Sequence, residues 1–444
     1  MSGERPIGVI GVGWVGLVTA TCFADMGHEV IAMDIDAAKV RSLSGGKVPI
    51  HEPGIDELLE RNAERLTFTT EMDDVLESAR LLFCCVDTPP TYSGDADLSR
   101  VQAVVSQLSE EGDHALVMKS TVPSGTGRAI LRDAPGLAYV SCPEFLKEGT
   151  AVDDFLHPDR VVIGADAGAE WAADAIEAIY RPLGGEIVRT DVASAEMIKL
   201  AANAFLATKI SFINEIANVC EEVGADVSEV ARGMGMDKRI GPSFLRAGVG
   251  YGGSCFPKDV SALKQLAGNT GYHFQLLTAV IEVNELQKRR VIGKLQKHLG
   301  SLAGKTIALL GLAFKPDTDD MREASSLVLA ARLQGEGAMV RGYDPVAGAR
   351  AHELLPGVEL HRSAQETLAG ADAAVLVTEW PEFAELDWDL MRDRMANALV
   401  VDGRNFLDAA RLRGAGFAYE GIGLANGDSD EATMAPESAE ASSH

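Results

Sequence analysis

One cysteine, Cys255, lies in a segment that suits neither a hydrophobic core nor a disulfide. The segment reads GYGGSCFPKD (250–259), with glycines before the thiol and a lysine shortly after it. Glycines permit a close approach of backbone and ligand that larger residues forbid. A nearby lysine such as Lys258 lowers the pKa of a thiol and increases its reactive thiolate fraction. The pattern is typical of a nucleophilic cysteine in a loop that presses on a ligand.

A second chemical pattern, G-x-G-x-x-G, lies between a predicted strand and a predicted helix. Gly11, Gly13 and Gly16 follow the apolar run PIGVIG, and the next strand pattern, EVIAMDID, contains Asp34, 18 residues after Gly16. In this context the glycines let the backbone approach a pyrophosphate at the helix N-terminus. Asp34 would accept from the adenine ribose and repel a 2′-phosphate, which favours NAD over NADP.

Further polar residues lie in apolar surroundings. Lys199 and Asn203 are spaced i, i+4 on a long helical pattern, so both face the same way. The lysine either extends to the surface or stabilises an oxyanion, and the pattern alone leaves both open. Glu144 and Glu148 have the same spacing after a proline, which on spacing alone favours an ordinary helix start. Thr121 ends a strand at the edge where ligands of parallel sheets bind.

The elements that must position these residues are strands alternating with helices, which predicts an α/β fold with parallel, doubly wound sheets. Residues 194–223 are helical without a strand and apolar on more than one face, which is typical of a helix buried between domains or subunits. Another helical stretch covers about 274–299. KTIALLGLAF (305–314) then repeats the opening pattern, which suggests a second α/β domain of related design.

The second repeat places Lys315 and Arg322 where the first has its glycine turn. Bases at a helix start are unfavourable for the helix dipole, so a bound anion, such as the phosphate of a nucleotide sugar, would explain them. The alternative is two solvated bases on a loop. We expect a first domain over 1–190, a helical dimerisation region over 191–300, a second domain over 301–424 and a disordered acidic tail over 425–444.

Composition excludes several classes of function. The 444 residues carry a formal net charge of −26, which makes nucleic acids and anionic membranes poor partners. Neither a signal peptide nor an apolar run of about 18 residues is found, so no membrane span is expected. The irregularly spaced cysteines favour the reducing cytoplasm over a disulfide framework, and no metal site is expected. We expect the five other cysteines in the core, namely Cys22, Cys84, Cys85, Cys142 and Cys220.

Six motifs in order, GVIGVGWVGLVTA, STVPSGT, CPEFLKEGTAVDDFLHPDRVVIG, EMIKLAANAFLATKISFINEIA, RIGPSFLRAGVGYGGSCFPKD and GLAFKPDTDDMREAS, resemble the UDP-glucose/GDP-mannose dehydrogenase family, and most closely its UDP-glucose branch. The resemblance covers all but the acidic tail. It implies two Rossmann-like domains joined by a long central helix, a homodimer, and oxidation of UDP-glucose to UDP-glucuronate with two NAD through a thiohemiacetal and a thioester on Cys255. Relatives in the family oxidise GDP-mannose or N-acetylated UDP-hexosamines.

The resemblance also assigns roles and reverses the structural interpretation of Glu144 and Glu148. The catalytic set is Cys255, Lys199, Asn203, Asp259, Thr121 and Glu144. The cofactor set, including the motif residues, is Gly11, Val12, Gly13, Gly16, Asp34, Lys39, Thr88, Thr121, Glu148, Lys258 and Arg322. The substrate set is Glu144, Phe145, Leu146, Lys147, Glu148, Lys199, Asn203, Arg239, Phe244, Leu245, Arg246, Ala247, Gly248, Gly252, Phe314, Lys315 and Arg404, with Arg239 reaching the neighbouring subunit.

One position departs from the family pattern. Its usual Val-Gly-Thr-Pro reads Val86-Asp87-Thr88-Pro89, so a carboxylate is added beside a phosphate-bearing cofactor. Two other functions compete with the covalent route: a two-electron hydroxy-acid dehydrogenase, which would tolerate Cys255→Ser, and a non-catalytic NAD sensor. Neither needs a thiol in the glycine-rich loop.

Overall fold

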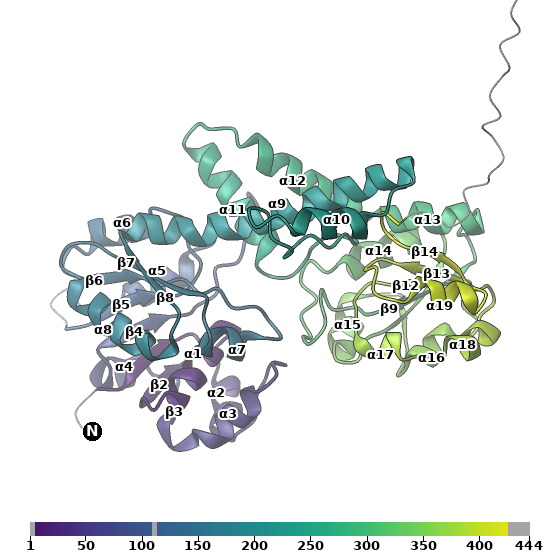
Figure 1. Ribbon diagram of the computed structural model, residues 1–444. Coiled ribbons are helices and arrows are strands. Elements are labelled where there is room, and N and C mark those ends of the chain that lie inside the picture. The colour runs from purple at the N-terminus through teal and green to yellow at the C-terminus, as the bar shows by residue number, and fades with distance from the viewer. Residues whose placement is uncertain (1–4, 109–112, 425–444) are drawn as a thin grey trace, which may run out of the picture.

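The computed structural model describes residues 5–108 and 113–424. Figure 1 shows two sheet domains, purple-blue and green-yellow, bridged by the teal helices of the middle of the chain. The predicted fold class, two α/β domains joined by a long helix, is confirmed. The predicted acidic tail over 425–444 lies outside the described residues.

The first sheet has eight strands. Its order is β3 (Leu66–Thr69), β2 (Val30–Met33), β1 (Ile7–Ile10), β4 (Leu81–Cys84), β5 (Ala115–Met118), β6 (Ala138–Ser141), β7 (Arg160–Ala165) and β8 (Glu186–Thr190). The expectation of a parallel sheet is wrong at one pair, because β7 runs antiparallel to β6. Residues 142–159 do not return the chain to the end of the sheet where β6 starts. β7 therefore starts at the end where β6 finishes, and it runs in the opposite direction.

Both faces of this sheet are buried. Alternate residues of β4 and β5 enter two separate cores, Phe83 and Val117 on one side and Leu82 and Leu116 on the other. This is the behaviour of a doubly wound sheet, whose strands are apolar on both faces. The helices of this domain are α1 (Trp14–Asp25), α2 (Ala37–Ser44), α3 (Ile55–Arg61), α4 (Met72–Ser78), α5 (Ser99–Val105), α6 (Thr126–Asp133), α7 (Ala151–Leu156) and α8 (Glu170–Tyr180).

The middle of the chain is built on α9 (Val192–Val223), a single helix of 32 residues, as the sequence predicts. It begins where the Asp191 side chain accepts from the Ser194 N–H and ends at Gly224, whose φ of 74° is left-handed. Packed on it are α10 (Val227–Gly235), α11 (Phe256–Asn269) and α12 (Gln275–Gln287). The stretch predicted as one helix over 274–299 is two, because α13 (Arg290–Leu299) starts after a break.

The second sheet confirms the predicted repeat. Its order is β11 (Glu359–Leu360), β10 (Met339–Tyr343), β9 (Thr306–Leu310), β12 (Ala373–Leu376), β13 (Leu399–Asp402) and β14 (Ala418–Glu420). The helices around it are α14 (Ser325–Gly335), α15 (Gly348–Leu354), α16 (Ala364–Leu368), α17 (Pro381–Ala384), α18 (Trp388–Arg394) and α19 (Ala409–Gly414). Within the described ranges, none of the helices is both long and apolar enough to cross a membrane.

Candidate active site

The glycine turn after β1 has the form that a dinucleotide requires. Gly11 has φ +87°, and a Cβ on Gly16 would lie 1.8 Å from the Gly11 carbonyl oxygen, so helix and turn approach as only glycine allows. The N-terminus of α1 starts at Gly13, with no side-chain cap and no acid in its first turn. Its N–H groups and partial positive charge are therefore available to a phosphate.

Asp34 stands at the end of β2 beside this turn. Its Oδ2 accepts from the Val12 N–H and the Lys39 ammonium, each at 2.8 Å, and its Oδ1 accepts from the Asp36 N–H at 3.0 Å. The carboxylate thus ties strand and glycine turn together. Thr88 and Thr121 meet near the same edge, where the Thr88 hydroxyl donates to the Thr121 carbonyl at 2.8 Å.

These features test the fit of NAD. The glycine turn, the uncapped helix and the acid at the end of β2 are the parts that hold a pyrophosphate and an adenine ribose in such folds. In the described residues a Cβ on Gly13 would meet only one atom within 4 Å, Asp87 Oδ1 at 3.7 Å. The space above Gly13 is therefore open, and the site fits the cofactor.

Four of the six predicted catalytic residues form two pairs. Lys199 of α9 donates to Glu144 Oε1 at 2.9 Å, with side chains only 4% and 5% exposed. One turn further along α9, Asn203 donates to Asp259 Oδ2 at 2.6 Å. Cys255, half-buried, immediately precedes α11, the helix that carries Asp259.

The thiol of Cys255 lies in the field of these charges. Burial raises its pKa to about 11, Glu144 and Asp259 add to the rise, and Lys199 opposes it. The expectation of a lowered thiol pKa is therefore wrong for this structure. Lys258 Nζ lies 2.6 Å from Asp259 Oδ1, so its positive charge stabilises that carboxylate and not a thiolate. The resting thiol is protonated at neutral pH.

Glu144 remains ionised beside it. Burial alone would raise the pKa of Glu144, but the charge and hydrogen bond of Lys199 outweigh burial and hold the pKa below its ordinary value. The Leu146 N–H, at 2.5 Å from Oε2, also favours the carboxylate. The centroid of the Phe145 ring lies 3.8 Å from the Arg160 guanidinium carbon and 5.4 Å from Lys199 Nζ.

The segment around Glu144 and Glu148 is a loop, so the predicted helix start is wrong. The helix begins only at Ala151, and Gly149 has φ +83°. The buried carboxylate of Glu52 holds this loop, accepting from the Gly149 N–H at 2.7 Å and the Ala151 N–H at 2.8 Å. Sequence reasoning missed Glu52, because nothing local in HEPG marks an acid that bonds a loop about 100 residues away.

Glu148 joins the first domain to the second. Thr318 and Ser254 donate to its carboxylate at 3.1 and 3.3 Å, and Arg322 lies 3.5 Å from it. Lys315 donates to its backbone carbonyl. Burial and the nearby Asp320 raise the pKa of Glu148 to about 7, against the opposing charges of Arg322 and Lys315. The two bases predicted at an anion site thus reach across to the first domain.

The glycines before Cys255 are required by close packing. A Cβ on Gly252 would lie 2.2 Å from the Glu323 carbonyl oxygen, and one on Gly253 would lie 2.8 Å from the Phe314 ring. The loop is therefore wedged against the second domain. Asn284 fixes it from α12, bonding both the N–H and the carbonyl of Tyr251 at 2.8 and 3.0 Å.

The expected substrate loop 244–248 lies in the same region, and Phe244 has a strained φ of 64°. Leu245 and Ala247 are buried in a core with α9, so these two side chains pack rather than line an opening. Asn214 accepts from the Gly248 N–H at 2.9 Å and Arg246 donates to the Arg404 carbonyl at 3.1 Å. Arg404 donates to the carbonyls of Val377, Phe314 and Gly250.

Two predicted substrate residues have exposed side chains that pair with acids. Arg239 is exposed and pairs with Asp237 at 2.6 Å. Lys147 pairs with Asp154 at 2.9 Å, also at the surface. The five cysteines predicted in the core are all buried and free, which confirms that prediction.

Comparisons with known proteins agree along the chain. The UDP-glucose/GDP-mannose dehydrogenase family matches in three segments: its NAD binding domain over 5–184, its central domain over 193–286 and its UDP binding domain over 308–409. UDP-glucose 6-dehydrogenase TuaD of Bacillus subtilis is 45% identical over 94% of this chain and 93% of its own.

Other relatives and solved structures give the same picture. UDP-glucose 6-dehydrogenase of Pseudomonas aeruginosa is 46% identical over 94% of this chain and 96% of its own. The structure of a UDP-glucose dehydrogenase from Pyrobaculum islandicum has a TM-score of 0.88 at 36% identity, covering 96% of this chain and 99% of that one. The chain therefore belongs to the UDP-glucose/GDP-mannose dehydrogenase family.

Proposed function

We propose that the protein oxidises UDP-glucose to UDP-glucuronate in two successive NAD-dependent steps. The observation that carries this proposal is the Cys255 thiol at the start of α11, within range of the charges of the buried pairs Lys199–Glu144 and Asn203–Asp259. A two-electron dehydrogenase would not need a thiol there. The names of the relatives at 45–46% identity favour UDP-glucose over the alternatives, GDP-mannose or a UDP-N-acetylhexosamine.

NAD would be held by the glycine turn, Asp34, Lys39 and Thr88, together with Glu148, Lys258 and Arg322. When bound, NAD accepts one hydride in each of the two oxidations. The first turns the C6 alcohol of the sugar into an aldehyde. Lys199 and Asn203 donate to the oxygen that carries negative charge as the carbonyl is made and attacked.

Covalent catalysis by Cys255 then divides the second oxidation into easier steps. The sulfur bonds to the aldehyde carbon, the thiol proton leaves to a carboxylate or water, and the oxygen is protonated to a thiohemiacetal. Its oxidation leaves a thioester. Water held by Thr121, Glu144 and Asp259 attacks that carbon, the C–S bond breaks, and the thiol takes up a proton as the acid leaves. Because the resting thiol is protonated, removal of its proton is part of the chemical barrier.

The second domain would hold the nucleotide end of the sugar. Phe314, Lys315 and Arg404 are the proposed contacts, together with the loop 244–248 and Gly252. Lys315 and Arg404 now donate to backbone carbonyls, and a diphosphate would take over some of these bonds. We propose the division into 1–190, 191–300 and 301–424 on this basis, and the six free cysteines support a cytoplasmic location.

The experiment is a count of NADH formed per sugar, for the wild type and for Cys255→Ser. Two NADH per UDP-glucose, with no acid released by the variant, would support the thioester route. One NADH, with a variant that still turns over, would refute it and make Cys255 structural. Turnover of GDP-mannose or a UDP-N-acetylhexosamine but not UDP-glucose would refute only the sugar.

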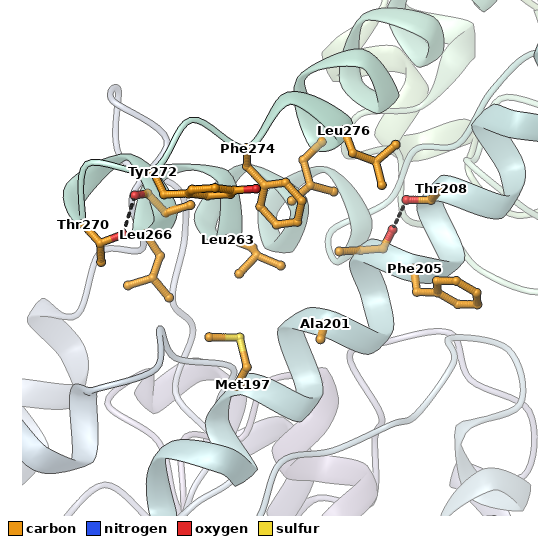
Figure 2. A pocket seen from close by; sticks show the side chains of 13 residues that line it. Met197, Ala201, Phe205, Thr208, Leu263, Leu266, Thr270, Tyr272, Phe274 and Leu276 are labelled. Atoms are coloured by element: carbon orange, nitrogen blue, oxygen red, sulfur yellow. Dashed lines mark hydrogen bonds between the residues drawn. The ribbon is translucent and has the colours of Figure 1, made fainter.

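We further propose a homodimer formed through the central helices. Apolar side chains of α9, α11 and α12 line a groove of about 430 Å³. Figure 2 shows Met197, Leu263 and Leu276 among them. On α9, the side chains of Phe205, Phe212 and Val219 are exposed at seven-residue intervals. Apolar residues at this spacing are typical of helices that pack on each other. A second copy of the chain would cover the groove and these three side chains.

The oligomeric state tests this directly. Phe205→Asp combined with Phe212→Asp should convert a dimer to a monomer in multi-angle light scattering. Leu390→Asp, which changes an exposed leucine on the second domain, is the matched control and should leave the mass unchanged. A monomeric wild type would refute the dimer and, with it, the reach of Arg239 into the neighbouring subunit.

A further inference from the structure

Asp87 lies at the point of the first sheet where a dinucleotide pyrophosphate binds. The strand order reverses between β1 and β4, and ligands of such sheets bind in the crevice at this reversal. Asp87 follows β4 by three residues, next to Val86, which a Cβ on Gly11 would touch at 3.0 Å. Its Oδ1 is the atom that lies 3.7 Å from the Cβ position of Gly13.

A carboxylate in this position would weaken the binding of a diphosphate at the glycine turn. The uncapped N-terminus of α1 attracts a diphosphate, whereas a bare Asp87 would repel it across the same small space. The chain has a net charge of −26, so no general excess of cations relieves the repulsion. A local positive charge must do so if NAD is to bind well.

Arg100 supplies that charge. It lies in the first turn of α5, and its Nη1 donates to Asp87 Oδ2 at 2.8 Å, with both side chains more than half exposed. Asp87 therefore presents one oxygen to Arg100 and the other to the glycine turn. In the described part of the chain the guanidinium makes no second hydrogen bond, so its other N–H groups are available to a phosphate oxygen.

We propose that Arg100 is a further NAD-binding residue, held over the glycine turn by Asp87 and donating to the pyrophosphate. Asp87 is its positioning partner, and the pair replaces the glycine usual at this place. The proposal rests on the use of NAD under the proposed function. Arg100 then both neutralises Asp87 and supplies part of the attraction to the diphosphate.

The test is the affinity for NAD and for ADP-ribose, measured by calorimetry at low and high salt. Arg100→Gln should raise both dissociation constants about tenfold, since one charge is lost and another is uncovered at a partly exposed site. The difference should shrink at about 0.5 M salt, because screening weakens exposed charges. The double variant Asp87→Asn with Arg100→Gln should recover part of the loss, since the uncovered carboxylate is gone.

Two controls keep the result specific. Arg132→Gln removes another exposed arginine of this domain, ion-paired with Asp133, and should change neither constant. The melting temperature and the affinity for UDP-glucose should be unchanged in every variant.

Three results would overturn the proposal. The first is Arg100→Gln within twofold of the wild type, which would make the pair an ordinary surface ion pair. The second is a double variant no better than Arg100→Gln. The third is an equal loss of UDP-glucose affinity. A wild type that binds UDP-glucose but no NAD would instead refute the proposed function.

Discussion

Replacing Lys199 by methionine should destabilise the protein strongly, apart from its effect on activity. The ammonium lies 2.9 Å from Glu144 Oε1, and the two side chains are 4% and 5% exposed. Methionine fills a similar volume, so the main change is an ionised carboxylate left buried without its cation. Removing one partner of such a pair costs about 3–5 kcal/mol. For a domain of this size the melting temperature should fall by on the order of 10 °C.

The free energy of unfolding should depend on pH in opposite directions in the wild type and in Lys199→Met. In the wild type the folded pKa of Glu144 is lowered, so its stabilisation is present above the unfolded value of about 4.5 and is lost as pH falls through the folded value. Without Lys199, burial should raise that pKa, so stability should fall as pH rises from about 4.5. The deficit of Lys199→Met should therefore be small near pH 4.5 and large at pH 8.

Thermal unfolding of three proteins from pH 4.5 to 8 would measure this. The third is the double variant Lys199→Met with Glu144→Gln, which has no buried charge to strand and should regain most of the lost stability. A single variant within about 1 kcal/mol of the wild type would show that water reaches Glu144 and would refute the reasoning. So would a deficit that does not change with pH.

Three further predictions concern the thiol, the glycine turn and the domain junction. Alkylation of Cys255 by iodoacetamide, followed by mass spectrometry, should have its midpoint near pH 11 and move lower in Glu144→Gln; a wild-type midpoint near the ordinary value of about 8.5 would contradict this. Gly16→Ala should lower the melting temperature, because its Cβ meets the Gly11 carbonyl, whereas Gly13→Ala should fold normally and bind NAD more weakly; equal melting temperatures would argue against the close contact. Glu148, with its raised pKa of about 7, should make stability fall as pH rises from about 4.5 to above 7, and Glu148→Gln should abolish this slope in thermal unfolding; an unchanged slope would place the titration elsewhere.

Some features were predictable because short stretches of sequence encode them. The glycine turn and Asp34 depend on spacing within one strand–helix–strand unit, and the structure has them as expected. The span of α9 follows from uninterrupted helical periodicity between Asp191 and Gly224. Backbone hydrogen bonds within a helix join residues four apart, so their pattern is visible locally.

Other features went against local preference. The loop around Glu144 and Glu148 has the sequence of a helix start, yet Glu52 accepts from its backbone N–H groups and keeps it irregular. Cys255 has a lysine three residues away, yet that lysine pairs with Asp259 and burial decides the thiol pKa. In both cases groups distant in sequence or the loss of water outweighed the neighbours in the chain.

By itself, the sequence determined which residues could do chemistry here and which elements would carry them. Only the tertiary structure decided their partners. Glu144 meets Lys199 across 55 residues, Asn203 meets Asp259 across 56, and Asp87 meets Arg100 at the reversal point of the sheet. The physical reason is that a side chain's charge state and hydrogen bonds depend on what lies within a few ångströms of it and on how much water is excluded. Those neighbours are set by the packing of whole strands and helices, not by position along the chain.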